Sequence, residues 1–330
     1  IDPNLGVVAV PDGRLDALAA LIHPEKVVPA TVEFVDIAGL VAGASQGAGL
    51  GNQFLGHIRN VDAIAMVVRA FHDPDVPHVT PELNPLADIA TVDMELLLAD
   101  LATLERRLEK VHAQAKGQPR HHASQEDALL RRAQAHANAG QLLNTLAMDE
   151  SERQLLKPLN LLTQKPRVYV INVSESDLPG GGEAARAVQR QAQGEGSQAV
   201  PICANLEAAL LDWPAAEAAA YRADLNLAEP GLDALVHAGY RLLDLITFFT
   251  TTGGKVLHAW ELKRGHSVLE AAGKIHSDMQ RGFIRAEVVT VPDLLAAGSI
   301  AQAREQGHWR LEGREYIVHD GDVIHIRFAV

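Results

Sequence analysis

An aspartate ends a short β-rich segment, and a glycine follows it three residues later. The run Thr31–Val35 leads into Asp36, and Gly39 completes the pattern Asp-x-x-Gly. In enzymes that cleave a phosphoanhydride, such an aspartate holds Mg²⁺, usually through water, and the glycine lets a backbone N–H approach the γ-phosphate. Four further glycines in residues 40–52 are typical of a segment that orders around a phosphate. An ordinary turn after a strand is the alternative, because the short pattern is weak by itself.

Four apolar, β-branched runs are the elements that would position such a site. They lie at residues 31–35, 63–71, 167–173 and 198–204, and a helical stretch at 183–193 separates the last two. Strands that alternate with helices predict a parallel sheet with crossover helices.

The middle of the chain, residues 86–162, has a helical pattern instead. Apolar residues recur along one seam with charges between them, at Leu97, Leu101, Leu104, Leu108 and Val111. This spacing predicts an antiparallel helical hairpin inserted into the sheet domain. The sequence Lys-Gly-Gln-Pro at residues 116–119 supplies its turn.

The last part of the chain changes character again. We expect a strand at 256–262, a helix at 267–276 and a strand at 285–291, followed by a hairpin formed by 316–318 and 323–328. These elements predict a small α+β module of roughly eighty residues, which is within the usual size of a domain.

Composition and charge argue against several classes of protein. No apolar run reaches the ~18 residues needed to span a bilayer, so we expect no membrane partner. The single cysteine, Cys203, cannot form an internal disulfide and suits a reducing compartment such as the cytoplasm. A formal net charge of −13 is unfavourable for general nucleic-acid binding, and we expect no DNA partner. The histidines lack the spacing of a zinc site.

The longer string around Asp36 resembles a known family. VEFVDIAGLVAGASQGAGLGNQFL, residues 32–55, is similar to the switch II segment of YchF and other Obg-like ATPases, which are related to the Ras-type GTPases. Leu40 then stands where Ras-type proteins carry the glutamine that orients the attacking water. The segment Ile1–Val8 resembles the family's switch I from its second position on. The resemblance therefore places the phosphate-binding loop before Ile1, and we expect this chain without that loop to be inactive.

The resemblance also implies a base-binding site. Ras-type proteins read guanine with Asn-Lys-x-Asp, whereas the segment Asn172-Val173-Ser174-Glu175 resembles the Asn-x-x-Glu of the YchF subfamily. The lysine is replaced and the acidic side chain is one methylene longer, so the resemblance implies a preference for ATP. The family's last base-contacting loop corresponds to the end of the next strand. The implied nucleotide contacts are Asn172, Val173, Glu175, Ala204 and Asn205. Alternatively, Asn172 caps a turn at a strand end.

A loop histidine is the implied substitute for the missing glutamine. His78 ends the loop that follows the apolar run 63–71, and it aligns with a catalytic histidine of the family. An imidazole can orient a water molecule or accept its proton near neutral pH. A solvated loop histidine beside prolines is the alternative.

The C-terminal module resembles the TGS domain, a β-grasp module. The resemblance rests on AAGKIHSDM, residues 271–279, and GFIRAEV, residues 282–288. Basic residues make this region locally positive, namely Lys255, Lys263, Arg264, Lys274, Arg281 and Arg285. This distribution favours contact with RNA or the ribosome over an ordinary solvated surface.

The resemblance spans nearly the whole chain and implies a fold and a function. The expected fold is α/β, a P-loop NTPase of the Ras-like type with a helical-hairpin insertion and a C-terminal α+β TGS domain. Residues 1–85 and 165–246 would form the nucleotide-binding domain, 86–164 the insertion and 247–330 the TGS domain. The expected function is an Mg²⁺-dependent ATPase switch that acts on the ribosome or the translation machinery. The alternative is a nucleotide-gated binding protein in which hydrolysis is slow or dispensable.

Overall fold

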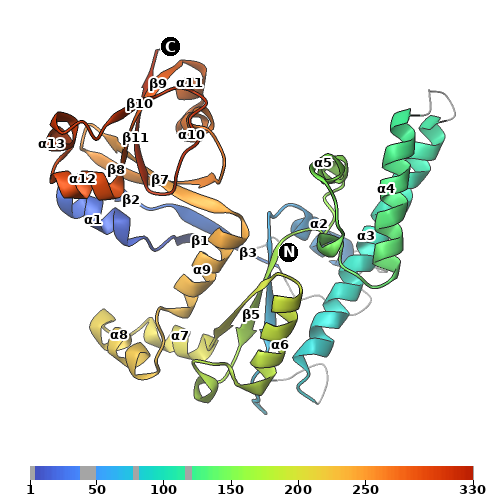
Figure 1. Ribbon diagram of the computed structural model, residues 1–330. Helices are drawn as coiled ribbons and strands as arrows, with labels where there is room; N and C mark the ends of the chain where they lie inside the picture. The colour runs from blue at the N-terminus through green and yellow to red at the C-terminus, as the bar shows by residue number, and fades with distance from the viewer. Residues whose placement is uncertain (1–3, 38–49, 77–81, 116–120, 330) are drawn as a thin grey trace. The chain divides into compact units, whose positions relative to one another are not determined.

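The computed structural model describes residues 4–37, 50–76, 82–115 and 121–329 (Figure 1). The chain divides into two compact units. One contains residues 1–5 and 35–235, and the other contains residues 6–34 and 236–330.

A parallel sheet of three strands is the centre of the first unit. The strands are β4 (Ile64–Arg69), β5 (Arg167–Asn172) and β6 (Gln198–Ile202), in the order β4-β5-β6. The first five residues of β5 are all buried, because neighbouring elements cover both faces of a central parallel strand. This explains why the run reads as continuously apolar rather than alternating.

Helix α6 (Gly182–Gly194) makes the crossover from β5 to β6. It buries Ala185, Val188 and Ala192, which recur at helical spacing, against Tyr169 and Ile171 of β5. The predicted parallel sheet with a crossover helix is therefore confirmed for three of the four predicted strands. The fourth, β3 (Thr31–Asp36), pairs instead with β1 (Asn4–Ala9) in a separate two-stranded sheet.

The insertion is built on two long helices, α3 (Pro85–Ala115) and α4 (His121–Asn138), which pack side by side (Figure 1). The predicted leucine seam of α3 faces α4, where Leu129, Leu130 and Ala133 are buried. The chain then passes through η1 (Leu143–Thr145), α5 (Glu150–Leu156) and η2 (Lys157–Leu159) before it returns to the sheet.

Two buried polar contacts fix that return. The carboxylate of Asp100 is fully buried and accepts hydrogen bonds from the backbone N–H of Leu162 and Thr163, at 2.7 and 2.8 Å, and from the Thr163 hydroxyl at 2.7 Å. Arg167, at the start of β5, pairs with Asp93 of α3 at 2.5 Å. These bonds set where the insertion ends and the central strand begins.

A six-stranded sheet forms the second unit. Its order is β10-β9-β11-β7-β8-β2. The strands from the C-terminal part of the chain are β7 (Leu245–Thr252), β8 (Val256–Lys263), β9 (Phe283–Thr290), β10 (Arg310–Glu312) and β11 (Asp322–Phe328). Helices α10 (Val268–Ile275), α11 (Ser277–Arg281), α12 (Val291–Ala297) and α13 (Ile300–Glu305) complete the unit.

The expected hairpin of 316–318 with 323–328 is not formed. Within 316–318 only Ile317 makes an isolated bridge, to Ser267, whereas β11 pairs with β9 and β7. The buried carboxylate of Asp322 accepts hydrogen bonds from the Tyr316 hydroxyl and from the backbone N–H of His319, both at 2.9 Å. Side-chain bonding of this turn takes the place of a two-strand ladder.

An early segment of the chain joins the C-terminal unit, which the sequence did not indicate. Strand β2 (Lys26–Val28) extends the six-stranded sheet by parallel pairing with β8, and helix α1 (Gly13–Ile22) buries Leu15 and Leu18 in the same core as Leu257. We expected residues 6–34 to lie with the nucleotide-binding domain. The apolar face of a short amphipathic helix does not specify which sheet it covers, so sequence pattern alone cannot decide this.

Candidate nucleotide-binding site

The carboxyl ends of the three parallel strands form one edge of the first unit. Arg69, Asn172 and Ile202 lie side by side there as the last residues of β4, β5 and β6. Ligands of open parallel sheets bind beyond this edge, because the loops that leave it can supply side chains and helix N-termini. It is the candidate nucleotide-binding site.

The two predicted base-contacting loops meet at this edge. The side-chain oxygen of Asn172 accepts a hydrogen bond from the backbone N–H of Ala204 at 3.1 Å, and the backbone N–H of Val173 donates to the Ile202 carbonyl at 2.9 Å. Ala204 and Asn205 are exposed at the start of α7 (Ala204–Leu210). The loop after β5 and the loop after β6 are thus held together by the side chain that the sequence singled out.

Val173 and Glu175 occupy different environments. The Val173 side chain is buried in the core with Val188 and Leu206, so it does not face the surface of the loop. Glu175 is exposed at the start of η3 (Glu175–Asp177). The site therefore presents the Glu175 carboxylate, whereas the side chain that replaces the guanine-reading lysine packs inside the unit.

A tyrosine that the sequence gave no reason to select holds that carboxylate. The hydroxyl of Tyr221, on α8 (Ala215–Asp224), donates to Oε1 of Glu175 at 2.5 Å, and this bond raises the pKa of Tyr221. The Tyr221 ring also packs against Trp213, with ring centroids 5.5 Å apart.

Glu207 ties α7 to the elements that follow it. One carboxylate oxygen accepts from Arg222 of α8 at 3.0 Å, and the other accepts from the backbone N–H of Gly231, the first residue of α9 (Gly231–Leu242), at 2.7 Å. A Cβ atom at position 231 would come within 2.9 Å of the Ile202 side chain and 3.1 Å of the Glu207 carboxylate. Only glycine allows this approach, which braces the loop that carries Ala204.

Arg69 organises the loop that leads from β4 toward His78. Its guanidinium donates to the carbonyl oxygens of Phe71, Asp73 and Val76 at 3.2, 3.1 and 2.9 Å, and it lies 4.7 Å from the centroid of the Phe71 ring. Arg69 is therefore a positioning residue that the sequence analysis missed, since a charged residue at a strand end has no distinctive pattern.

Asp36 is the described residue on the side of the site that would face the phosphates. Asp36 is the last residue of β3 (Thr31–Asp36), which forms a two-stranded sheet with β1 (Asn4–Ala9). Its exposed carboxylate pairs with nothing among the described residues. A free carboxylate of this kind fits Mg²⁺, which keeps waters and substrate phosphates as its other ligands. Gly39 and His78, like Leu40, lie outside the described residues and stay predictions.

Helix α2 (Leu50–Arg59) follows the glycine-rich segment in the chain and packs against α3. In α2, Leu55 and Ile58 are buried against Leu96 and Ala99 of α3. Arg59 donates to the Thr103 hydroxyl and the Asn160 carbonyl, both at 3.1 Å. The segment after Asp36 is therefore connected to the helical insertion.

Comparison with known proteins identifies the family. A Bacillus subtilis protein named "Ribosome-binding ATPase YchF" is 46% identical over 332 residues, which cover 100% of this chain and 90% of the relative. The chain belongs to the YchF family. A relative of the same name from Escherichia coli O157:H7 is 42% identical over 330 residues, with the same coverage of both chains.

Two further comparisons agree with YchF membership. The family model YchF-GTPase_C, described as "Protein of unknown function (DUF933)", matches residues 245–329. The solved structure of the Schizosaccharomyces pombe YchF GTPase matches 99% of this chain and 88% of its own chain, with a TM-score of 0.88 and 32% identity. The expected fold class, a P-loop NTPase domain with a helical insertion and a C-terminal α+β domain, is confirmed. Among the described residues, no helix is long and apolar enough to cross a membrane.

Proposed function

We propose that this protein is an ATP-hydrolysing switch that prefers ATP to GTP and acts on the ribosome. The observation that carries the proposal is the hydrogen bond between Asn172 and Ala204, which joins two loops at the nucleotide edge of the sheet. The printed name of the relatives, "Ribosome-binding ATPase YchF", supports both the activity and the partner. With a ribosomal partner, we propose a cytoplasmic location for the protein.

Base recognition follows from the free groups at that edge. Because the side-chain oxygen of Asn172 is occupied by Ala204, its amide nitrogen is the group left to donate to a purine ring nitrogen. Both adenine and guanine offer such an acceptor, so Asn172 binds a purine without choosing between them. The choice falls to Glu175, with Ala204 and Asn205 completing the base site.

Tyr221 weakens the reading of guanine by Glu175. Guanine presents two donors, N1–H and the exocyclic amine, which a carboxylate binds best with both oxygens free. One Glu175 oxygen already accepts from Tyr221, and the Glu side chain is one methylene longer than the Asp of guanine readers. Adenine lacks the amine at that edge and loses nothing by this arrangement, so ATP is preferred.

On the phosphate side, the chain's own residues hold and orient the reactants. Asp36 would hold Mg²⁺ through water, the Gly39 backbone N–H would donate to the γ-phosphate, and His78 would orient the attacking water. Mg²⁺, when bound, neutralises charge on the β- and γ-phosphate oxygens. Arg69 holds the loop 71–76, which precedes His78, by three hydrogen bonds to its backbone.

Contact with ribosomal RNA is proposed through the C-terminal module and the helical insertion. Of the six basic residues that we singled out, three are engaged in ion pairs: Arg264 with Asp244, Lys274 with Glu261 and Arg281 with Asp278. The exposed residues Lys255, Lys263 and Arg285 form no ion pair with any described residue. These three are the strongest candidates for phosphate contact, since each can neutralise a phosphate without first breaking an ion pair within the protein.

A second candidate is a nucleotide-gated binding protein with slow turnover. Leu40 favours it, because a leucine at the position of the water-orienting glutamine cannot hydrogen-bond to water. Single-turnover ATP hydrolysis by the full-length gene product, with and without ribosomes, separates the two. Stimulation of about tenfold or more by ribosomes supports the ATPase switch, whereas nucleotide-dependent ribosome binding without stimulated hydrolysis supports the gated binding protein. Failure to hydrolyse or bind ATP at all contradicts both.

A further inference from the structure

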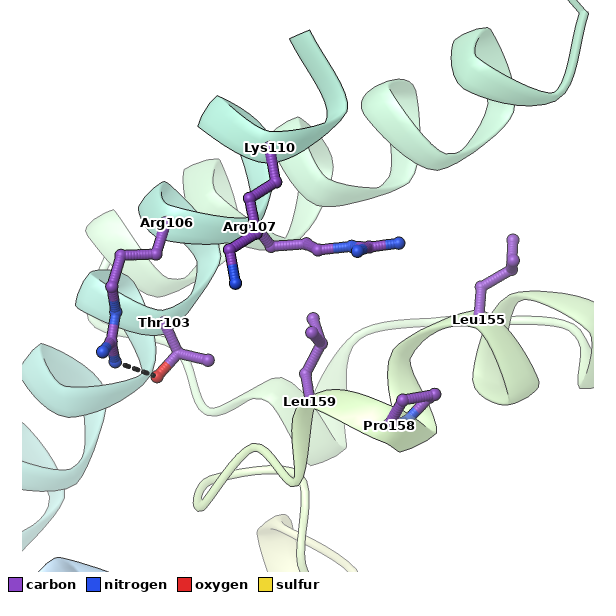
Figure 2. A pocket seen from close by; sticks show the side chains of 7 residues that line it. All are labelled: Thr103, Arg106, Arg107, Lys110, Leu155, Pro158 and Leu159. Atoms are coloured by element: carbon purple, nitrogen blue, oxygen red, sulfur yellow. Dashed lines mark hydrogen bonds between the residues drawn. The ribbon is translucent and has the colours of Figure 1, made fainter. Parts of the chain in front are cut away.

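A hollow of about 320 Å³ lies within the helical insertion, away from the nucleotide edge of the sheet (Figure 2). One side is formed by α3, and the other by α5 and η2. The residues from α3 are Thr103, Arg106, Arg107 and Lys110, and those from the other side are Leu155, Pro158 and Leu159. The hollow thus has a basic wall and an aliphatic wall.

The basic wall is a single helical stripe. Residues three, four and seven positions apart share one face of an α-helix, which is the spacing from Thr103 to Arg106, Arg107 and Lys110. The acidic residues Glu105 and Glu109 of the same helix do not line the hollow. The helix therefore presents a locally positive face in a chain of net charge −13.

Two of the three basic side chains, those of Arg106 and Lys110, form no ion pair with any described residue. Arg107 is paired with Glu126 of α4 at 2.7 Å. Arg106 donates only to neutral oxygens, the Ala102 carbonyl at 3.1 Å and the Thr103 hydroxyl at 3.4 Å. Lys110 forms no hydrogen bond or ion pair with any residue that the structure describes. An anion in the hollow would meet Arg106 and Lys110 without displacing an existing salt bridge.

The aliphatic wall opposite favours an anion that also carries an aliphatic group. Leu155 leaves 37% of its surface exposed, and Pro158 is exposed beside it. Among the residues that the structure describes, no aromatic ring lines the hollow, so a nucleobase would lack the stacking surface on which single-stranded RNA binding relies. An aliphatic side chain, in contrast, would remove Leu155 and its own surface from water.

We propose that this hollow binds an acidic peptide segment of a protein partner. The segment places an aliphatic side chain against Leu155 and Leu159, and its carboxylates face Arg106 and Lys110. The volume lies at the lower end of the range for ligand pockets and suits one or two side chains of an extended segment. The proposal is independent of the nucleotide site, because none of these residues contributes to it.

The test measures binding of a fluorescein-labelled peptide to the full chain by fluorescence anisotropy. The probe consists of aspartates and glutamates around a central pair of leucines. The comparison probes are the same peptide with serines in place of the leucines, and a uridine homopolymer of equal formal charge. The variants are Arg106→Gln with Lys110→Gln, and Leu155→Ser. Arg186→Gln with Arg190→Gln is the matched control, because it removes two exposed charges from α6.

We expect the leucine peptide to bind, and the Arg106/Lys110 double variant to raise its Kd about tenfold, equivalent to about 1.4 kcal/mol. The Leu155→Ser variant should raise the Kd about fivefold, whereas the α6 control should leave it unchanged. Thermal melting of each variant verifies that it is folded. No binding, or equal affinity for the serine peptide, would overturn the proposal. Tighter binding of the RNA, lost in the same double variant, would assign the hollow to nucleic acid instead.

Discussion

Replacing Gly231 by alanine tests the brace behind the base-binding loop. The new Cβ would lie 2.9 Å from Cγ2 of Ile202, 3.3 Å from its Cγ1 and 3.1 Å from Oε1 of Glu207. The first distance is too short for two carbon atoms, so the Ile202 side chain or the start of α9 must move. A movement of α9 stretches the 2.7 Å bond from the Gly231 N–H to Glu207. Overpacking of this kind costs about 1–3 kcal/mol.

The same helix offers a matched control. A Cβ at Gly239 would meet nothing within 4 Å, so the change to alanine should stabilise the helix by about 0.4–1 kcal/mol. Gly231→Ala and Gly239→Ala are chemically identical and should act in opposite directions. Their free energies of unfolding should therefore differ by about 1.4–4 kcal/mol.

Urea unfolding monitored by the fluorescence of Trp213, Trp260 and Trp309 together measures the difference, because Trp213 lies in the same compact unit as Gly231 and the other two lie in the same unit as Gly239. Adenine-nucleotide affinity should fall with Gly231→Ala and stay constant with Gly239→Ala, since Glu207 lies on the helix that begins at Ala204. If the two variants were equally stable, the close approach of α9 to Ile202 and Glu207 would be wrong.

Three further substitutions address the site and its support. Tyr221→Phe frees one oxygen of Glu175, so the ratio of kcat/KM for GTP to that for ATP should rise about two- to fivefold, as expected for an exposed hydrogen bond of about 0.5–1 kcal/mol. His78→Ala should lower kcat at least tenfold and leave the Kd for nucleotide unchanged. Asp100→Ala leaves three buried donors of Leu162 and Thr163 without an acceptor and should cost about 3 kcal/mol at neutral pH. Burial raises the pKa of Asp100 above its ordinary value of 3.8, so its contribution to stability is greatest below pH 3.8 and falls as the pH rises through the folded-state pKa.

Each of these substitutions has an outcome that contradicts its reasoning. An unchanged selectivity ratio in Tyr221→Phe would mean that the bond to Glu175 does not restrain base reading. Unchanged turnover in His78→Ala would remove this residue from catalysis. For Asp100, urea unfolding of the wild-type chain and the alanine variant between pH 4 and 7 should show a gap that narrows with rising pH; a gap that widens would reverse the sign of the pKa argument.

The parallel sheet and the helical hairpin could be predicted because their signals are local and repeated. The run at β5 reads as a buried strand over its whole length, and the α3 seam from Leu97 to Val111 fixes the face that packs on α4. Asn172 and Ala204 could be paired before the structure because both follow parallel strands, whose carboxyl ends share one edge. The hydrogen bond between Asn172 and Ala204 shows that the two strand ends do lie together.

Features that depend on contact between distant segments could not be predicted. The pairing of β2 with β8 joins residues more than two hundred positions apart and leaves only a short polar-apolar pattern in the sequence. The roles of Tyr221 and Arg69 likewise depend on where α8 and the loop 71–76 come to lie. For the same reason, the sequence does not show that acidic partners such as Glu261 neutralise part of the basic character of the C-terminal module.

The choice of base is the central claim, and steady-state kinetics on the full-length gene product tests it most directly. The measurement is kcat/KM for ATP and for GTP under identical Mg²⁺ and ionic strength, with Asn172→Ala as the variant that should lower both. We predict that kcat/KM is at least tenfold higher for ATP. An equal or higher value for GTP would contradict the account of Glu175 and Tyr221 as a disabled guanine reader.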